Sequence, residues 1–468
     1  MDGLECSEIY FSQIDLRDRF DSDYYTKNYL HISDQMSKVP TKKLGKLATT
    51  VASAFYPAAT QLYSEGDTAF VRCVDCVSYP VITKDQDSKF EKIPYSFGKE
   101  NKGISFIKAE DIIITKVGTP CYASILTDYD EIALSRTVMG LTGIHGINPY
   151  YLMAFLRCKY GFEQLFRQRE LTIQYQLTLP RVKAVDVFVA DDKLQKTVKR
   201  LCEKSRKLQK ESNESYQLAE QTLVEIVKCP DFSTTSTHSI KSINESFVRS
   251  GRLDAEYYQP KYESIAQKLN TSETVLSLCN LYNKNFVPQE KQSYQYIELA
   301  DVGQSGDVSD VDIQYGSDLP TRARRIVKSG QIIVSSVEGS LQSCALITDE
   351  YDGALCSTGF YVLDSDYINS ETLLVLFKSE PIQALMKQHC SGTILTAISK
   401  DELLSMPLPM IDEDVQKVIA AKVQESFALR QQSKQLLEYA KQAVEMAIEQ
   451  GEDAALEWLN TVTHEQEA

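Results

Sequence analysis

The sequence lacks the features that would place the chain in a membrane or in an oxidising compartment. It has no run of 18 or more apolar residues, so we expect no membrane-spanning helix. Its first twenty residues are acidic and contain no apolar signal core, which predicts a cytoplasmic protein. Its eleven cysteines are odd in number and follow no disulfide-framework spacing, so we expect reduced, buried thiols.

Motifs for catalysis and for metal binding are scarce. No Gly-x-Gly turn for a cofactor occurs near residue 146, and no Gly-x4-Gly-Lys-Ser/Thr loop for ATP occurs anywhere. The five histidines are scattered, and no carboxylate pair with a neighbouring lysine recurs along the chain. Cys73 and Cys76 form the only Cys-x-x-Cys pair, without a second pair or a nearby histidine to complete a zinc site. We therefore predict a chain that is not an enzyme and binds no metal or cofactor of its own.

Basic charge is in short supply, and it is unevenly distributed. The formal net charge is −15. Residues 1–230 contain 31 Lys+Arg and 30 Asp+Glu, whereas residues 231–468 contain 19 and 35. A chain of this charge can bind nucleic acid only through focused basic patches, or together with a basic partner.

The sequence contains an internal repeat, which determines the expected architecture. The offset between the copies stays between 220 and 233. The matched pairs are "RFDSDYY" (19–25) with "RLDAEYY" (252–258), "FVRCVDCV" (70–77) with "YIELADVG" (296–303), "FIKAEDIIITKVG" (106–118) with "RIVKSGQIIVSSVE" (325–338), and "SILTDYDEIALS" (124–135) with "ALITDEYDGALCS" (345–357). Cys73 and Cys76 fall opposite Leu299 and Val302 in a strand-like run, so we expect both to be small core residues.

Residues 148–151, Asn-Pro-Tyr-Tyr, differ by one residue from the Asn-Pro-Pro-Tyr of amino-methyltransferases, in which Asn and Pro accept hydrogen bonds from a target amine. The repeat places Asn369 and Ser370 opposite Asn148 and Pro149, and an apolar helical pattern follows in both copies. Asn at the N-cap and Pro at the first helical position mark a helix start. We predict a helix cap; the alternative is a DNA adenine methyltransferase.

A long helical segment ends each copy. Small and apolar residues recur at spacings of three and four, and Ser205 and Ser212 have counterparts at Ser426 and Ser433, both at the same offset. We expect the helices to pair as an antiparallel coiled coil whose small residues permit close approach; the alternative is two separate amphipathic helices. The expected seam consists of Leu194, Val198, Leu201, Ser205, Leu208, Ser212, Ala219, Val415, Ile419, Ser426, Leu429, Ser433, Leu436 and Ala440.

The predicted fold class is mixed α/β (α+β), with two tandem globular modules that are each followed by a long helix. Short β-rich runs at 111–114 and 331–334 predict buried strands within the modules. The expected order is module 1–190, helix 191–229, linker 230–245, module 246–411, helix 412–450 and a short tail, 451–468.

This organisation resembles the specificity (S) subunit of type I restriction-modification systems over nearly the whole chain. The motifs that carry the resemblance are "RFDSDYY" and "RLDAEYY", "IKAEDIIITKVG" and "VKSGQIIVSSVEG", and the approach to each helix. The second module has the family's aliphatic-Pro-Leu-Pro run as Met406-Pro-Leu-Pro409 before Gln416, whereas the first has Val185-Asp-Val-Phe188 before Gln195. The entry into the first helix therefore departs from the family pattern.

The resemblance implies a non-catalytic subunit in which two target-recognition domains recognise the halves of a bipartite sequence in double-stranded DNA. It also implies that the helices dock two methyltransferase subunits, which bind S-adenosylmethionine, and that motor-nuclease subunits can join this core. A helix of 38 residues is about 57 Å long, enough to separate half-sites one DNA turn apart, roughly 34 Å. The remaining alternative is a duplicated protein scaffold without DNA recognition.

Candidate DNA contacts are basic side chains for phosphates and planar polar side chains for base edges. In the first module they are Lys42, Lys43, Lys46, Arg136, Arg167, Arg169, Gln174, Tyr175 and Gln176. In the second module they are Arg322, Arg324, Arg325, Thr393 and Thr396.

Overall fold

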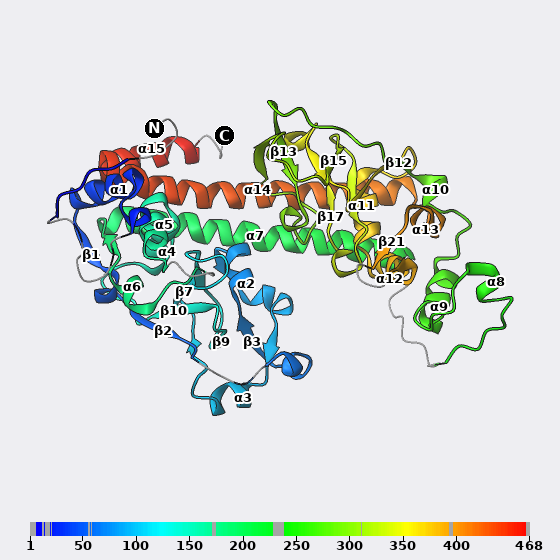
Figure 1. Ribbon diagram of the computed structural model, residues 1–468, viewed down its shortest axis with the longest axis horizontal. Coiled ribbons are helices and arrows are strands. Elements are labelled where there is room, and N and C mark those ends of the chain that lie inside the picture. The colour runs from blue at the N-terminus through cyan, green and yellow to red at the C-terminus, as the bar shows by residue number, and fades with distance from the viewer. Residues whose placement is uncertain are drawn as a thin grey trace. The chain divides into compact units, whose positions relative to one another are not determined.

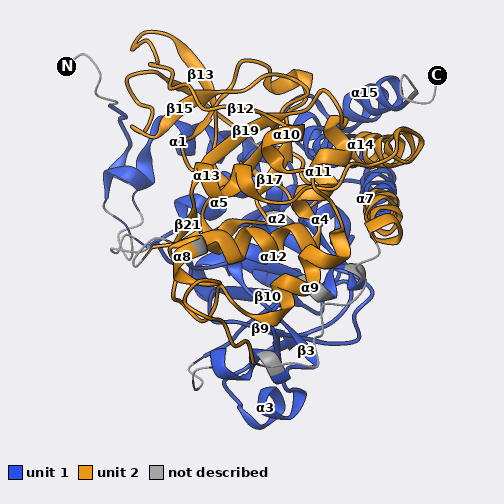
Figure 2. Ribbon diagram, turned by 90° about the vertical axis from the view of Figure 1, so that its right-hand side faces the viewer, with its two compact units in different colours: residues 1–210, 431–468 blue, residues 211–430 orange. Residues whose placement is uncertain are grey.

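The computed structural model divides into two compact units, which Figure 2 shows in different colours. Unit 1 comprises residues 1–210 and 431–468, and unit 2 comprises residues 211–430. The structure describes residues 6–11, 14, 19, 21–54, 57, 59–170, 175–227, 238–309, 311–392 and 396–464. Among these residues, no helix combines the length and the apolarity needed to cross a membrane.

Unit 1 is built around two sheets. The five-stranded sheet has the order β2 (Thr49–Ala52), β10 (Val138–Thr142), β7 (Ile112–Thr115), β8 (Ala123–Leu126) and β4 (Val81–Ile82). The four-stranded sheet has the order β5 (Lys92–Ile93), β3 (Thr68–Val71), β9 (Ile132–Leu134) and β6 (Phe106–Ile107). The central strand β7 is an isoleucine run that is fully buried, as expected for a strand covered on both faces.

Unit 2 repeats this plan with two four-stranded sheets. Their orders are β12 (Asn280–Tyr282), β19 (Phe360–Asp364), β16 (Ile332–Ser335), β17 (Cys344–Leu346), and β14 (Asp312–Tyr315), β13 (Ser293–Ile297), β18 (Leu355–Ser357), β15 (Ala323–Ile326). Strands β3 and β9 pair in parallel in unit 1, and their counterparts β13 and β18 do so in unit 2. The duplication therefore extends to strand topology.

Shorter elements complete the units (Figure 1). In unit 1 they include α1 (Lys27–Ser37), α2 (Cys73–Ser78), α3 (Tyr95–Glu100), α6 (Leu179–Lys183) and the ribbon of β1 (Thr41–Lys43) with β11 (Asp186–Phe188). In unit 2 they include α8 (Phe247–Ser250), α9 (Pro260–Leu269), α10 (Val275–Leu278), α13 (Lys400–Ser405) and the ribbon of β20 (Cys390–Ser391) with β21 (Ala397–Ile398).

The Cys-x-x-Cys pair lies on α2, so the prediction of a strand there was wrong. Strand β3 ends at Val71, and the Asp75 carboxylate accepts a hydrogen bond from the Arg72 N–H at 2.8 Å, which caps the start of the helix. Cys76 is fully buried, as a small core residue should be, whereas Cys73 is only partly buried. The ten described cysteines are all free thiols, and eight of them are buried.

Asn148 begins helix α4 (Pro149–Arg157), which confirms the helix-cap prediction. Its side-chain Oδ1 accepts hydrogen bonds from the backbone N–H groups of Tyr150 (3.0 Å) and Tyr151 (3.4 Å). Both tyrosines are buried, and the backbone N–H of Asn148 donates to Oε1 of Gln195 at 2.7 Å. The methyltransferase alternative is therefore wrong at this site, because a flipped base could reach neither the amide nor the rings.

The second unit uses the same cap and the same glutamine. Helix α11 (Ser370–Lys378) begins at Asn369, whose Oδ1 accepts from the Thr372 N–H at 2.9 Å. Oε1 of Gln416 accepts from the Asn369 N–H at 2.8 Å, and its Nε2 donates to the carbonyl of Ile411 at 2.9 Å. In each unit, one glutamine thus bonds a backbone group at the start of its own long helix and another at the start of the Asn-capped helix. This shared role explains why both copies have a glutamine at this position.

The motif that opens unit 1 forms a clasp on the end of helix α5 (Lys159–Arg167). The guanidinium of Arg19 pairs with Asp21 at 2.6 and 2.8 Å and donates to the carbonyl of Arg169 at 2.9 Å. The ring of Tyr24 lies 4.7 Å from the guanidinium, and the Tyr25 hydroxyl donates back to the Arg19 carbonyl at 3.1 Å. The clasp therefore supplies donors to carbonyls that the helix end leaves free.

Unit 2 contains the same clasp at the end of helix α12 (Glu380–His389). Arg252 pairs with Asp254 at 2.8 and 2.7 Å and donates at 3.1 Å to the carbonyl of Cys390, the counterpart of Arg169. Tyr257 lies 4.4 Å from the guanidinium, and the hydroxyl of Tyr258 donates to the Arg252 carbonyl at 3.0 Å. Each clasp fixes the point at which the chain leaves the helix toward the next loop.

Two long helices, α7 (Asp192–Val227) and α14 (Glu413–Gln450), contribute to both units (Figure 1). In unit 1 the hydroxyls of Ser205 and Ser433 lie 2.9 Å apart, and Ser433 also donates to the Ser205 carbonyl at 2.8 Å. In unit 2 Ser212 contacts the hydroxyl and the carbonyl of Ser426 at 3.0 and 2.8 Å. From Ser205 to Ser212 the chain advances seven residues on α7, while the partner on α14 moves back seven residues, from Ser433 to Ser426. The two helices are therefore antiparallel. The predicted fold class is confirmed.

The chain ends in a short helix that packs on unit 1. Gly451 adopts a left-handed backbone conformation (φ +98°) and ends α14, as its position predicts. Helix α15 (Glu452–His464) follows in the segment that the sequence marked as a short tail. Leu456 and Leu459 are buried in the unit 1 core, and the ring of Trp458 meets that of Tyr439 edge-on at 5.6 Å.

Candidate nucleic-acid interface

Three loops of unit 1 meet where strands β7 and β9 end. The backbone N–H of Lys116 donates to the carbonyl of Thr137 at 2.8 Å, and the carbonyl of Lys116 accepts from the N–H of Leu177 at 2.9 Å. Gln176 forms isolated bridges with Val117 and with Glu170. Lys116, Arg136 and Tyr175 are therefore brought to one place from distant parts of the sequence.

This place concentrates positive charge around an exposed ring. Lys116 and Arg136 lie on neighbouring loops, because the Lys116 N–H bonds to the carbonyl of Thr137, the residue after Arg136, and burial and the charge of Arg136 lower the pKa of the Lys116 amine. The guanidinium of Arg169 lies 4.2 Å from the centroid of the Tyr175 ring, which is 43% exposed. Cations beside an accessible ring suit a phosphate next to a stacked base. We call Lys116, Arg136, Arg169 and Tyr175 the cationic loop cluster.

Other predicted contacts in unit 1 have varied surroundings. Lys42 and Lys46 are exposed on and beside β1, whereas Lys43 pairs with Asp186 at 2.8 Å. Arg167 is committed internally, because its Nε donates to the Tyr24 carbonyl at 2.7 Å and the Tyr24 ring lies 4.0 Å away. Its role as a DNA contact stays a prediction. Gln174 lies outside the described residues.

The corresponding loops of unit 2 have the same backbone but different side chains. The N–H of Ser336 donates to the carbonyl of Gly359 at 2.8 Å, and its carbonyl accepts from the N–H of Ile398 at 2.9 Å, as at Lys116. Ser336 therefore replaces Lys116, and Thr358, next to Gly359, replaces Arg136. Thr396 stands opposite Tyr175 and is partly buried, and Thr393 lies outside the described residues.

The three arginines in and just before β15 differ in availability. Arg322 has a side chain that is 59% exposed, 3.3 Å from Glu298. Nε of Arg324 donates to the Thr321 carbonyl at 2.9 Å, and this residue is partly exposed. Arg325 donates to the Asn283 carbonyl and to Oδ1 of Asn285, and burial lowers its pKa. Arg322 and Arg324 can face a phosphate, whereas Arg325 holds a loop, and its role as a DNA contact stays a prediction.

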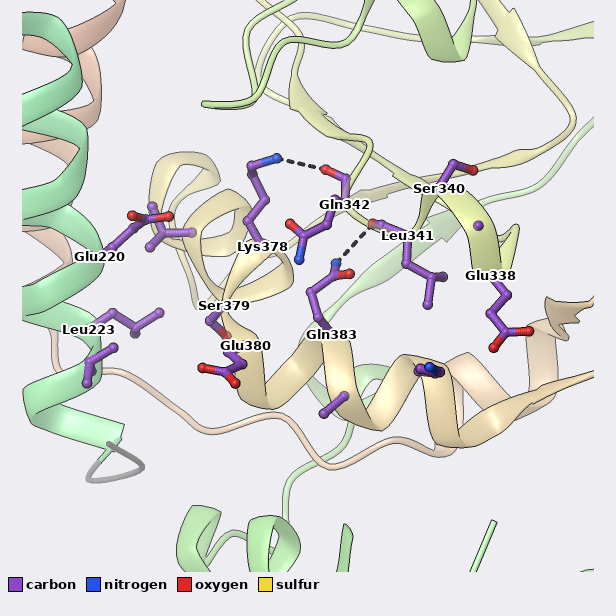
Figure 3. A pocket seen from close by; sticks show the side chains of 15 residues that line it. Glu220, Leu223, Glu338, Ser340, Leu341, Gln342, Lys378, Ser379, Glu380 and Gln383 are labelled. Atoms are coloured by element: carbon purple, nitrogen blue, oxygen red, sulfur yellow. Dashed lines mark hydrogen bonds between the residues drawn. The ribbon is translucent and has the colours of Figure 1, made fainter. Parts of the chain in front are cut away.

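Unit 2 also contains a cavity of about 690 Å³ beside helices α7, α11 and α12 (Figure 3). The amine of the buried Lys378 donates to the Gln342 carbonyl at 2.7 Å, and burial lowers its pKa. Nε2 of Gln383 donates to the carbonyls of Leu341 (2.9 Å) and Phe377 (2.6 Å). These polar groups are thus engaged with the backbone, and the residues lining the cavity include no histidine or cysteine.

Aromatic rings occupy the equivalent position in unit 1. Phe162, the counterpart of Gln383, stacks on Phe166 with ring centroids 5.6 Å apart and meets Tyr122 edge-on at 5.6 Å. In unit 2 the matching residues are Gln383, Lys387 and Ser343. Gln383 and Lys387 line the cavity, so polar side chains stand there in place of the two stacked rings of unit 1.

The structure gives no reason to place a metal in the described part of the chain. Within it, no three His, Cys, Asp or Glu side chains are grouped as ligands. Burial raises the pKa of the Cys121 thiol to about 12, which disfavours the thiolate needed for ligation or nucleophilic attack.

Sequence reasoning missed Lys116, which stands alone after an apolar strand. Its signal was its place in the repeat, since "ITKVG" ends a strand that is matched by "VSSVE". Because one copy has lysine and the other has serine at this position, the fold does not require either residue there.

No family model and no curated protein matches the sequence. Several solved structures are similar to it at low TM-scores. The S subunit of a type I restriction-modification system from M. genitalium has 10% identity and a TM-score of 0.36, covering 89% of this chain and 94% of that chain. The HsdS subunit from Thermoanaerobacter tengcongensis has 14% identity and a TM-score of 0.29, covering 88% and 97%. A chain from a type I R-M system has 14% identity and a TM-score of 0.28, covering 89% and 98%.

Proposed function

We propose that the chain is a non-catalytic DNA-specificity subunit of a type I restriction-modification complex. Each module recognises one half of a bipartite DNA target through the loops beside its clasp. The paired helices set the distance between the halves and dock methyltransferase subunits, which carry S-adenosylmethionine. Motor-nuclease subunits join the same core.

The cationic loop cluster is the observation that carries this proposal. In a chain of net charge −15, three cations and an exposed tyrosine lie on loops that the backbone bonds of Lys116 bring together. Neighbouring cations repel each other, and a bound phosphate would offset this repulsion. The repeat supports two recognition surfaces, because the same loops recur in unit 2 with different side chains.

The test is sequence selection by the intact complex. The full chain, co-expressed with the methyltransferase subunit of its own system, should enrich one bipartite sequence from a random DNA pool and methylate it. The variant Lys116→Gln/Arg136→Gln should lose affinity, while the matched variant Lys102→Gln/Lys108→Gln, which changes exposed lysines of unit 1 outside the cluster and the long helices, should not. Enrichment of no sequence by a well-folded complex would favour a protein scaffold without DNA recognition.

A further inference from the structure

Unit 2 exposes an apolar strip on α7 that has no counterpart on the surface of unit 1. The strip consists of Leu218, Thr222 and Ile226, which are four residues apart and therefore share one face of the helix. Leu218 is 47% exposed and Ile226 is 45% exposed. The Thr222 hydroxyl donates to the Leu218 carbonyl at 2.8 Å, so covering the strip would leave no new unsatisfied polar group.

The equivalent strip in unit 1 lies on α14 at Tyr439, Ala443 and Ala447, which match the strip at the offset that relates the paired serines. Ala443 is fully buried and Ala447 is 3% exposed. Both belong to the same core cluster as Ala455, Leu456 and Leu459 of α15. The Trp458 ring lies on Tyr439, the counterpart of Leu218. The chain's own last helix therefore covers in unit 1 the face that is open in unit 2.

The surroundings of the open strip indicate the charge of its partner. Residues 211–227 of α7 contain four glutamates, at 211, 214, 220 and 225, and no lysine or arginine. The preceding residues, 192–210, contain eight basic residues and two acidic ones. A segment that binds the strip should therefore combine apolar side chains with basic flanking residues.

We propose that Leu218, Thr222 and Ile226 form the docking strip for an amphipathic, basic-flanked helix of the methyltransferase partner, and that α15 closes the equivalent strip. This inference rests on the proposed function and deepens it. The two docking surfaces of the helix pair are then unequal. One methyltransferase subunit binds tightly at unit 2, and a second binds at unit 1 only in competition with α15.

The experiment uses the full chain co-expressed with the methyltransferase subunit of its own system, with subunits counted by native mass spectrometry. The variant Leu218→Gln/Ile226→Gln should weaken binding of the first subunit at least tenfold. The control Leu276→Gln removes an exposed apolar side chain (67%) on α10 of unit 2, outside the paired helices, and should change affinity less than twofold. Equal binding by the double variant and the wild type would overturn the inference.

Removal of α15 tests the second half of the proposal. A chain ending at Gln450, or Trp458→Ala in the full chain if the shorter chain does not fold, should bind the second methyltransferase subunit at least tenfold more tightly. Unchanged binding of the second subunit by a folded variant would refute a covering role for α15. If the wild type binds no methyltransferase, the proposed function itself fails; if it binds and only the strip variants behave like the wild type, the inference alone fails.

Discussion

The two units hold their frameworks with the same contacts but differ in the surfaces that those frameworks present. In both, the backbone N–H of the capping Asn donates a hydrogen bond to a glutamine side chain. Both also have an Arg-Asp-Tyr-Tyr clasp at the end of a helix. At the loops beyond the clasp, Lys116 and Arg136 of unit 1 correspond to Ser336 and Thr358 of unit 2. The repeat thus retains the contacts that satisfy buried backbone groups and changes positions on which the fold does not depend.

A second difference lies in how each unit ties its sheets to the helices. In unit 1 Arg206 of α7 pairs with Asp128 at 2.9 Å, with side chains 37% and 49% exposed. In unit 2 Arg430 of α14 pairs with Asp307 and donates to Ser305, with the paired side chains only 17% and 20% exposed. Removal of one partner should therefore cost more in unit 2 than in unit 1, because water screens the first pair while the second is largely buried.

The largest expected effect comes from removing the Arg430–Asp307 ion pair of unit 2. Asp307→Asn should lower the free energy of unfolding by about 2–3 kcal/mol, since it leaves the Arg430 guanidinium largely buried without its charge partner. The matched change Asp128→Asn in unit 1 should cost under about 1 kcal/mol. Urea denaturation of both variants measures the difference, and equal costs would show that burial does not distinguish the two pairs.

The next effect concerns the charge of the two recognition surfaces. Each phosphate contact contributes roughly 0.9 to the slope of log affinity against log salt. Lys116→Gln/Arg136→Gln should therefore reduce this slope by about 2. Arg322→Gln/Arg324→Gln should reduce it by about 1, because Glu298 already neutralises part of Arg322. Titrations of the complex with its target at several salt concentrations give both slopes, and a larger loss in unit 2 would reverse the comparison.

The smallest effect tests whether the two clasps are equivalent. The hydrogen bond from Arg19 lowers the pKa of Asp21, and that from Arg252 lowers the pKa of Asp254. Each folded-state pKa lies below the unfolded one, so the stabilisation is present above about pH 3.9 and is lost as the pH falls through the folded value. It should amount to about 1 kcal/mol or less, because both carboxylates are partly exposed.

Asp21→Asn and Asp254→Asn should each flatten the acid limb of a stability-versus-pH curve by similar amounts. Thermal melts between about pH 2 and pH 6 measure this limb. A marked change in only one variant would mean that the clasps share a geometry without sharing a role in stability.

Features with local causes could be predicted from the sequence. The cap at Asn148, the stop at Gly451 and the serines of the helix pair follow from backbone groups and spacing that a sequence displays. The duplication supports the cap prediction, since a helix cap requires only an Asn in the second copy, whereas a catalytic tetrapeptide would require all four residues.

Features that depend on distant partners could not be predicted in this way. Arg167 and Arg325 look like surface cations in the sequence, but each is committed to backbone carbonyls far along the chain. The Cys73 segment alternates like a strand, yet it forms a helix that Asp75 caps by accepting a hydrogen bond from the Arg72 N–H. Lys116 and Arg136 lie on neighbouring loops because strands β7 and β9 end at the same place in the fold. Only tertiary packing brings the ends of these two strands together.

The central claim is that two recognition modules read half-sites whose separation the paired helices determine. The most direct test removes seven residues at facing positions from both α7 and α14, which shortens each helix by about 10 Å, and selects DNA targets with the intact complex. The proposal predicts the same two half-sites with a gap shorter by about three base pairs, at roughly 3.4 Å each. An unchanged gap, or selection of a target without two halves, would contradict it.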